Sequence, residues 1–130
     1  MPGPQPATIL VVEDDAGIAS ILQRRLEAIG HGVHVEQTGR GALAFAAEFQ
    51  PDLVILDLRL PDLGGYEVCR ALRSLYTRWP VPIMMLTGMD KPVDQLRGFA
   101  HGADAYLVKP FDLNEVTRTI SELLGQAAPT

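Results

Sequence analysis

The chain has little of several features that would assign it to a particular class of protein. Its 130 residues include a single cysteine, Cys69, which excludes an internal disulfide framework and is typical of a reducing compartment such as the cytoplasm. No apolar run approaches the roughly 20 residues of a membrane-spanning helix. The segment 1–5 lacks the charged and apolar regions of a signal peptide. We therefore expect a cytoplasmic protein that does not bind membranes.

Clusters of basic residues are also missing. The formal net charge is -5, and Lys and Arg are scattered along the chain. Because nucleic-acid phosphates are bound by clustered Lys and Arg, we expect no direct nucleic-acid binding by this domain.

The composition that is present fits one globular domain, with 47% hydrophobic and 21% charged residues. Residues 1–6 contain three prolines and are predicted to form a disordered lead-in. The folded domain is expected over residues 7–125. Residues 126–130 are expected to be a flexible tail or the start of a linker.

Five apolar segments with strand character alternate with five segments of helical period. The strands are predicted at 8–12, 33–36, 81–86 and 103–108 and within the stretch 51–57, where Asp57 stands at the exit. Strands that alternate with helices in this way form βαβ units with right-handed crossovers. The sequence therefore predicts an α/β fold with a doubly wound parallel sheet, whose strand order periodicity alone does not give.

Polar residues stand directly after four of these strands: Glu13 and Asp14, Asp57, Thr87, and Lys109. Open α/β sheets place their ligands at the carboxyl ends of the strands, so we expect these side chains to converge on one edge. Converging carboxylates repel one another unless a proton, a basic group or a hard cation compensates them. Mg²⁺ prefers carboxylate and water oxygens and is the natural ligand for such a site.

The same residues suggest a reaction. An aspartate beside a divalent ion, a lysine and a hydroxyl can attack phosphorus and form an aspartyl phosphate. Lys109 would then neutralise the phosphoryl oxygens, and Thr87 would donate a hydrogen bond to them. Alone, Thr87 reads as a turn residue, Lys109 as a solvated lysine and Asp15 as a helix N-cap. Because each stands at the end of a different strand, Thr87 and Lys109 together favour a phosphoryl-transfer site.

Five motifs in this order resemble the receiver domain of two-component response regulators, over about residues 7–125. They are Ile9-Leu10-Val11-Val12-Glu13-Asp14-Asp15, Asp52-Leu53-Val54-Ile55-Leu56-Asp57, Leu60-Pro61-Asp62-Leu63-Gly64-Gly65, Met84-Met85-Leu86-Thr87-Gly88, and Gly102-Ala103-Asp104-Ala105-Tyr106-Leu107-Val108-Lys109-Pro110-Phe111. The resemblance implies a flavodoxin-like (βα)5 fold with strand order 2-1-3-4-5. It also implies that Asp57 accepts a phosphoryl group from a sensor histidine kinase or a phosphotransfer protein.

Further roles follow from the resemblance alone. Mg²⁺ would be held by Asp14, Asp57 and the backbone carbonyl of Arg59, with Glu13 acting through water. Thr87 and Tyr106 would form the conformational switch, and the peptide bond between Lys109 and Pro110 would be cis. The surface formed by the fourth helix, fifth strand and fifth helix would then meet an output domain or a downstream protein.

Three other functions are compatible with parts of this sequence. A hydrolase acting through an aspartyl phosphate favours a second aspartate two residues after the nucleophile, where this chain has Arg59. A flavin-binding domain of the same fold would need a phosphate-binding loop after the first strand, where Glu13 and the following acids would repel phosphate. The remaining alternative is a degenerate receiver acting as a phosphorylation-independent interaction module. We expect a signalling domain that catalyses only its own phosphorylation and dephosphorylation, and not an enzyme that turns over external substrate.

The three histidines show no metal-ligand spacing with one another or with Cys69. We predict that His31, His34 and His101 are surface or loop residues. Cys69 lies on the inner stripe of the third helix, which favours a small core hydrophobe over a reactive thiol.

Overall fold

The computed structural model describes residues 6–75 and 80–125. The expected tail 126–130 lies outside these residues, as does all of the expected lead-in except Pro6. Five strands alternate with five helices along the chain. They are β1 (Thr8–Val12), α1 (Ala16–Ile29), β2 (Gly32–Glu36), α2 (Gly39–Glu48), β3 (Leu53–Leu56), α3 (Gly65–Leu75), β4 (Ile83–Thr87), α4 (Pro92–Ala100), β5 (Ala105–Val108) and α5 (Leu113–Leu123).

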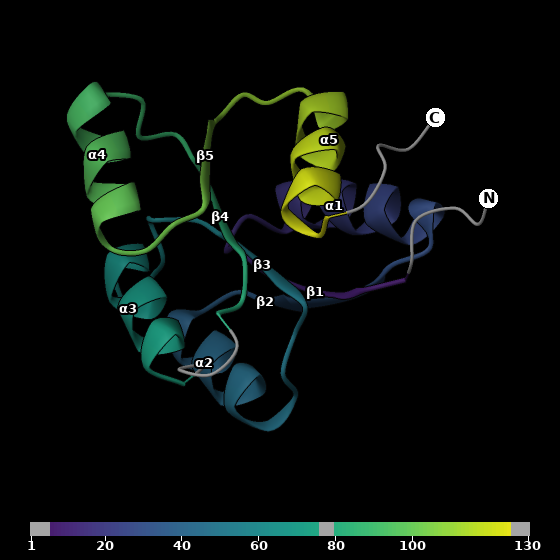
Figure 1. Cartoon of the computed structure of the whole chain (residues 1–130), viewed down its shortest axis with the longest axis horizontal. Coiled ribbons are helices and arrows are strands. Elements are labelled where there is room, and N and C mark those ends of the chain that lie inside the picture. The colour runs from purple at the N-terminus through teal and green to yellow at the C-terminus, as the bar shows by residue number, and fades with distance from the viewer. Residues whose placement is uncertain (1–5, 76–79, 126–130) are drawn as a thin grey trace.

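The strands form one parallel sheet in the order β2-β1-β3-β4-β5 (Figure 1). The order that the family resemblance implied is therefore confirmed. All side chains of β3 and β4 are buried, as expected for strands covered on both faces. In β1 only Thr8, at the start of the strand, is exposed.

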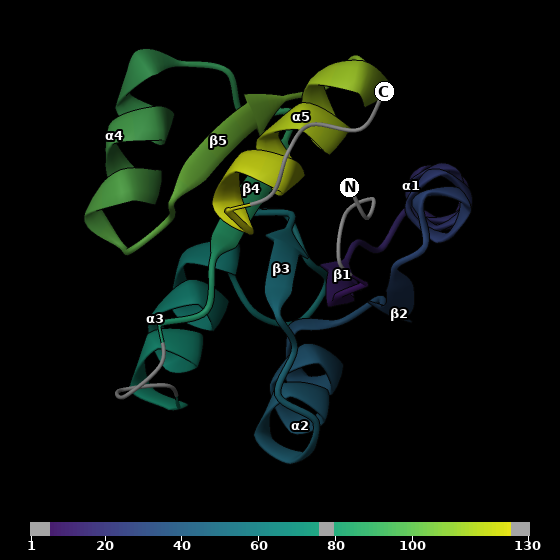
Figure 2. The same cartoon turned by 45° about the vertical axis from the view of Figure 1, so that its right-hand side comes forward.

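Helices cover both faces of the sheet. Figure 2 shows α1 and α5 on one side and α2 and α3 on the other, with α4 beside β5. Alternate residues of the central strands point to opposite faces and so build two cores. One core joins Leu10, Val54 and Met85 to α2 and α3, and the other joins Ile9, Ile55 and Met84 to α1 and α5.

Capping residues define the ends of the first two helices. Asp15 is the N-cap of α1, and its carboxylate accepts a hydrogen bond from the backbone N–H of Ile18 at 3.1 Å. Gly30 ends the same helix in the left-handed conformation, which glycine adopts without steric strain. Thr38 caps α2 through the backbone N–H of Gly41. In the described ranges, 6–75 and 80–125, no helix is long and apolar enough to cross a membrane.

His31 is a loop residue, as one of the two predicted alternatives had it, but it is not on the surface. His31 lies in the loop between α1 and β2 but is only 6% exposed. Its Nδ1 accepts a hydrogen bond from the backbone N–H of Ala7 at 3.1 Å, which fixes the entry to β1. Burial lowers the pKa of His31, and the negative charge of Asp52 opposes that shift only in part. The fold therefore favours the neutral form of His31.

We expect this histidine to make the protein less stable in mild acid. The unfolded chain binds a proton at His31 below about pH 6.5, whereas the folded chain resists it, so the free energy of unfolding falls as the pH drops below that value. Urea unfolding at pH 7.5 and 5.5 measures this loss. His31→Asn keeps an acceptor for Ala7 without a titrating ring, and the variant should lose less stability over the same range. Equal losses in both proteins would contradict the assignment.

Candidate functional site

The register of the central strands brings the predicted acids together. Val12 of β1 lies opposite Leu56 of β3, so Glu13 and Asp57 leave the sheet side by side. The pairing continues for one more residue, because the backbone N–H of Asp57 donates to the carbonyl of Val12 at 3.0 Å. Both carboxylates are almost fully buried, at 3% exposure for Glu13 and 6% for Asp57.

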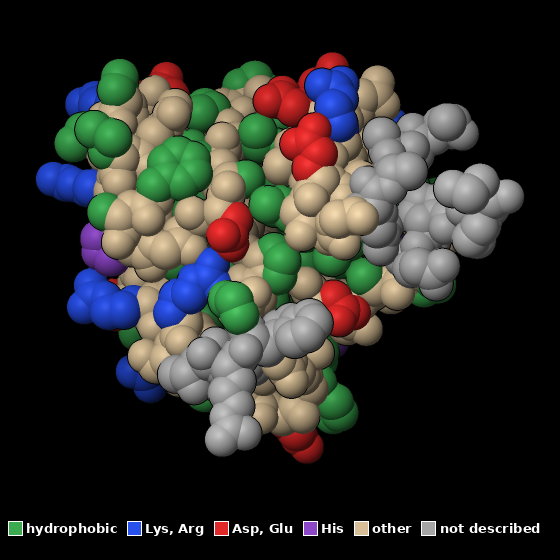
Figure 3. Space-filling view, viewed as in Figure 1, with side chains coloured by type: hydrophobic (Ala, Val, Ile, Leu, Met, Phe, Trp, Pro, Cys, Tyr) green, Lys and Arg blue, Asp and Glu red, His purple; other side chains and the backbone are tan. Residues whose placement is uncertain are grey.

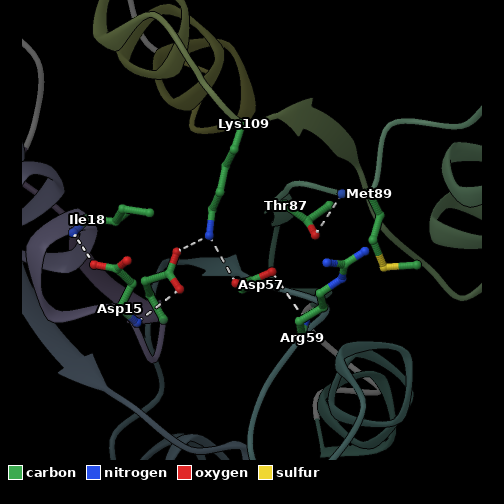
Figure 4. A network of polar contacts seen from close by, with 8 residues as sticks. Asp15, Ile18, Asp57, Arg59, Thr87, Met89 and Lys109 are labelled. Carbon is green, nitrogen blue, oxygen red and sulfur yellow. Dashed lines mark hydrogen bonds and ion pairs between the residues drawn. The ribbon is translucent and has the colours of Figure 1, made fainter.

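Lys109 reaches these two acids from the other half of the sheet. Its backbone N–H donates to the carbonyl of Thr87 at 2.8 Å, which places it at the end of β5. The Nζ atom lies 3.0 Å from Asp57 Oδ2 and also donates to Glu13 Oε1 (Figure 4). The Lys109–Pro110 peptide bond is cis, as the resemblance implied.

The electrostatics of this cluster follow from its burial. Burial raises the pKa of Glu13 to about 7, and the charge of Asp57 adds to this effect, although the hydrogen bond from Lys109 opposes it. Burial alone would lower the pKa of Lys109, but its hydrogen bonds to Glu13 and Asp57 outweigh burial and raise it. Lys109 is therefore a cation at neutral pH, while burial favours the protonated form of Glu13.

The acidic residues also fit a divalent cation. Glu13, Asp14 and Asp57 can each present a carboxylate oxygen within 4.8 Å of the others, and Asp14 is exposed to solvent. A set of oxygen donors with one open side is what Mg²⁺ prefers, because it keeps several of its waters. Arg59 touches the cluster through its backbone N–H, which donates to Asp57 Oδ1 at 3.2 Å. That its carbonyl is also a ligand stays a prediction.

The two predicted switch residues meet at Met89, in the loop after β4. Thr87 is fully buried, and its Oγ1 accepts a hydrogen bond from the backbone N–H of Met89 at 3.4 Å (Figure 4). The hydroxyl of Tyr106 donates to the backbone carbonyl of Met89 at 2.6 Å. Burial raises the pKa of Tyr106 to about 12, so the hydroxyl keeps the proton that it donates. The loop therefore links Thr87 to Tyr106 through one residue.

Two residues that position the loop after Asp57 were not assigned this role from the sequence. The carboxylate of Asp62 accepts hydrogen bonds from the backbone N–H groups of Gly39 and Arg40, which ties the loop to the first turn of α2. At Gly65 a Cβ atom would lie 2.7 Å from the backbone carbonyl oxygen of Asp57 and 2.5 Å from Leu58 Cα. Only glycine lets α3 start this close to the backbone of Asp57 and Leu58. Asp62 and Gly65 stood in a recognised motif, but their contacts depend on the tertiary fold.

This fold, with buried acids and a lysine at the carboxyl ends of its strands, defines a class of signalling domain. The family model of the response regulator receiver domain matches residues 9–121. The chain therefore belongs to the receiver domains of two-component response regulators, as its motifs indicated. A degenerate, phosphorylation-independent module is not supported.

Several known proteins are similar over almost the whole chain. Response regulator MprA of Mycolicibacterium vanbaalenii is 43% identical over 124 residues, which are 95% of this chain and 53% of that protein. The alkaline phosphatase synthesis transcriptional regulatory protein PhoP of Bacillus subtilis is 41% identical. The match covers 94% of this chain and 51% of that protein. The chain thus spans about half the length of these relatives.

Among solved structures, a putative response regulator from Chloroflexus aurantiacus has a TM-score of 0.88 and 33% identity. The match covers 94% of this chain and all of that one (100%). The chemotaxis protein CheY4 of Vibrio cholerae has a TM-score of 0.83 and 33% identity, over 92% of this chain and 99% of that one. The fold of the chain is therefore that of single receiver domains.

We expect Mg²⁺ to stabilise the protein through this acidic cluster. A ligand at ten times its Kd raises the free energy of unfolding by about 1.4 kcal/mol, or a few degrees in Tm for a domain of this size. Thermal unfolding with and without MgCl2 measures the shift. Asp14→Asn combined with Asp57→Asn should abolish it.

Asp15→Asn is the matched control for that experiment. It removes a neighbouring charge, yet Asn caps a helix as well as Asp does. Its Mg²⁺ shift should equal that of the unmodified protein, and a shift lost in both variants would point to general charge screening instead of a site.

Proposed function

We propose that Asp57 is the phospho-acceptor of this receiver domain. The observation that carries the proposal is the meeting of Asp57, Glu13 and Lys109 from three strand ends, with the Lys109 ammonium 3.0 Å from the Asp57 carboxylate. A buried carboxylate next to a fixed cation can act as a nucleophile and can keep its product compensated.

The proposed reaction transfers a phosphoryl group from a phosphohistidine to Asp57. An Asp57 carboxylate oxygen attacks the phosphorus of a phosphohistidine, an O–P bond forms, and the N–P bond breaks. The histidine nitrogen leaves with the bond's electron pair and takes up a proton from solvent. Lys109 then pairs with the phosphoryl oxygens in place of the free carboxylate. Mg²⁺, held by Asp14, Asp57 and the Arg59 carbonyl with Glu13 acting through water, would supply further positive charge to those oxygens.

Thr87 and Tyr106 turn this charge change into a change of shape. The Thr87 hydroxyl can donate to a phosphoryl oxygen, and a Thr87 that moves toward Asp57 gives up its contact with the backbone of Met89. Tyr106 holds the same residue from the other side, so phosphorylation would bias two conformations of the loop after β4. The domain then acts as a signalling module and catalyses no reaction on external substrates. Such a module is expected in the cytoplasm.

The readout surface proposed for a downstream protein or an output domain is made by α4, β5 and α5. Three large apolar side chains of α4 are exposed: Val93, Leu96 and Phe99, with Leu96 at 70%. Figure 3 shows hydrophobic side chains gathered over α4. Because α4 follows the loop that holds Met89, a change in the loop reaches this surface directly.

The proposal predicts that the protein phosphorylates itself from a small donor. After incubation with acetyl phosphate and MgCl2, intact-protein mass spectrometry should show one added phosphoryl group. Asp57→Asn or a chelator should prevent the addition. Persistent addition to the Asp57→Asn protein would mean that another residue is the acceptor.

A partner that carries phosphohistidine needs a surface beside Asp57. An apolar groove of about 540 Å³ lies between α1 and the start of α5, lined by Ile18, Ile21, Lys109, Pro110, Phe111 and Leu113. Lys109 belongs both to this groove and to the acidic site, so a helix docked in the groove would bring a histidine close to Asp57. We propose this groove as the docking surface for a histidine kinase or phosphotransfer protein.

Ile21, which is 49% exposed, tests that surface. Ile21→Glu should slow phosphoryl transfer from any histidine kinase that phosphorylates the unmodified protein, and should leave phosphorylation by acetyl phosphate unchanged. Leu96→Glu makes the same change on α4, and transfer to this control should be normal. Equal slowing in both variants would argue against the groove.

A further inference from the structure

Gly98 lies in the last turn of α4, where the helix passes over the ring of Tyr106. The residue is buried, and a Cβ atom at position 98 would lie 2.8 Å from Tyr106 Cδ2, 3.1 Å from Tyr106 Cε2 and 3.0 Å from Met85 Sδ. Real Cβ atoms do not approach carbon so closely, so α4 or the ring would have to move. Helix and ring are in contact only because position 98 has no side chain.

The backbone gives no other reason for glycine at this position. Glycines 30, 102 and 125 have a positive φ, but Gly98 is in ordinary helical conformation. A glycine in a helix is less favourable than an alanine at the same position. The space that Gly98 leaves for the Tyr106 ring therefore accounts for glycine at this position.

The ring of Tyr106 has little freedom to avoid a larger residue. Its hydroxyl is held by the carbonyl of Met89 at 2.6 Å. The ring of Phe99 is a neighbour, tilted by 48° with ring centroids 6.5 Å apart. Met85 can yield because its thioether chain is flexible, but a ring tied at its hydroxyl cannot turn away without losing that bond.

From this packing we propose that Gly98 is a positioning residue: it provides the slot under α4 that holds the Tyr106 ring with its hydroxyl on Met89. The role of Tyr106 as a switch rests on the proposed function, whereas the slot itself rests on the packing alone. The position of the ring and the distance of α4 from the sheet are thereby coupled. Any residue larger than glycine at position 98 disfavours the ring position seen in this structure.

A double-mutant cycle tests the slot without reference to phosphorylation. Gly98→Ala should lower the urea midpoint in the unmodified background, although alanine is the better helix former. In a Tyr106→Ala background the clash with the ring is gone, and the same change should raise the midpoint. Equal shifts in both backgrounds would overturn the proposal.

Gly17→Ala is the matched control for the cycle. It also replaces a glycine within a helix, but in α1, where a Cβ atom would meet only Asp15 Oδ1, at 3.2 Å. Its effect should be the same with and without Tyr106→Ala. The contrast between the two glycines separates contact with the ring from general helix propensity.

A second measurement follows the ring itself, by fluorine NMR of protein labelled with fluorotyrosine. Gly98→Ala should shift the resonance that Tyr106→Phe removes, and Gly17→Ala should leave it in place. In a titration with beryllium fluoride and MgCl2, the concentration for half response should then differ at least about fivefold between Gly98→Ala and Gly17→Ala. An unshifted resonance or an equal requirement would overturn the proposal.

The two hypotheses fail in different ways. If the unmodified protein does not respond to beryllium fluoride while the cycle is non-additive, the proposed function fails and the slot stands. If the unmodified protein responds through Asp57 while the cycle is additive, the function stands and the slot is wrong.

Discussion

The structure depends on one electrostatic arrangement, a single lysine that compensates buried carboxylates at the edge of the sheet. Glu13 and Asp57 leave adjacent strands with almost no exposure to solvent, and Lys109 contacts both. Two buried carboxylates without a cation would repel each other and lose their hydration, which is costly. The raised pKa of Glu13 shows that Lys109 does not fully compensate for burial. The site is therefore prepared to accept more positive charge.

This incomplete compensation connects the charge at the sheet edge to the packing of the domain. A phosphoryl group on Asp57 would add negative charge and new acceptor oxygens close to Thr87, which is fully buried and holds the backbone of Met89. Met89 is in turn held by Tyr106. Under the proposed function, one short loop would thus receive a signal from the carboxylate side and pass it to α4. No long pathway is needed, because Thr87 and Tyr106 both contact the backbone of Met89.

The sequence predicted the elements and the site better than the contacts that connect them. The strands were evident because their apolar runs end on polar residues, and the convergence of Asp57 and Lys109 follows from parallel topology alone. Strand order required the family resemblance, since periodicity carries no information on which strands are neighbours. The burial of His31 could not be predicted, because its partner Ala7 is 24 residues away and the pattern around it is that of a loop.

The contacts of the glycines were hidden for a similar reason. A glycine in a sequence signals a turn or a helix end, and Gly65 and Gly98 stand in helices. What they provide is the absence of a Cβ atom, against the backbone of Asp57 in one case and the ring of Tyr106 in the other. Both spaces adjoin residues of the site. The acid and the tyrosine are thus positioned by side chains that are missing as well as by those that are present.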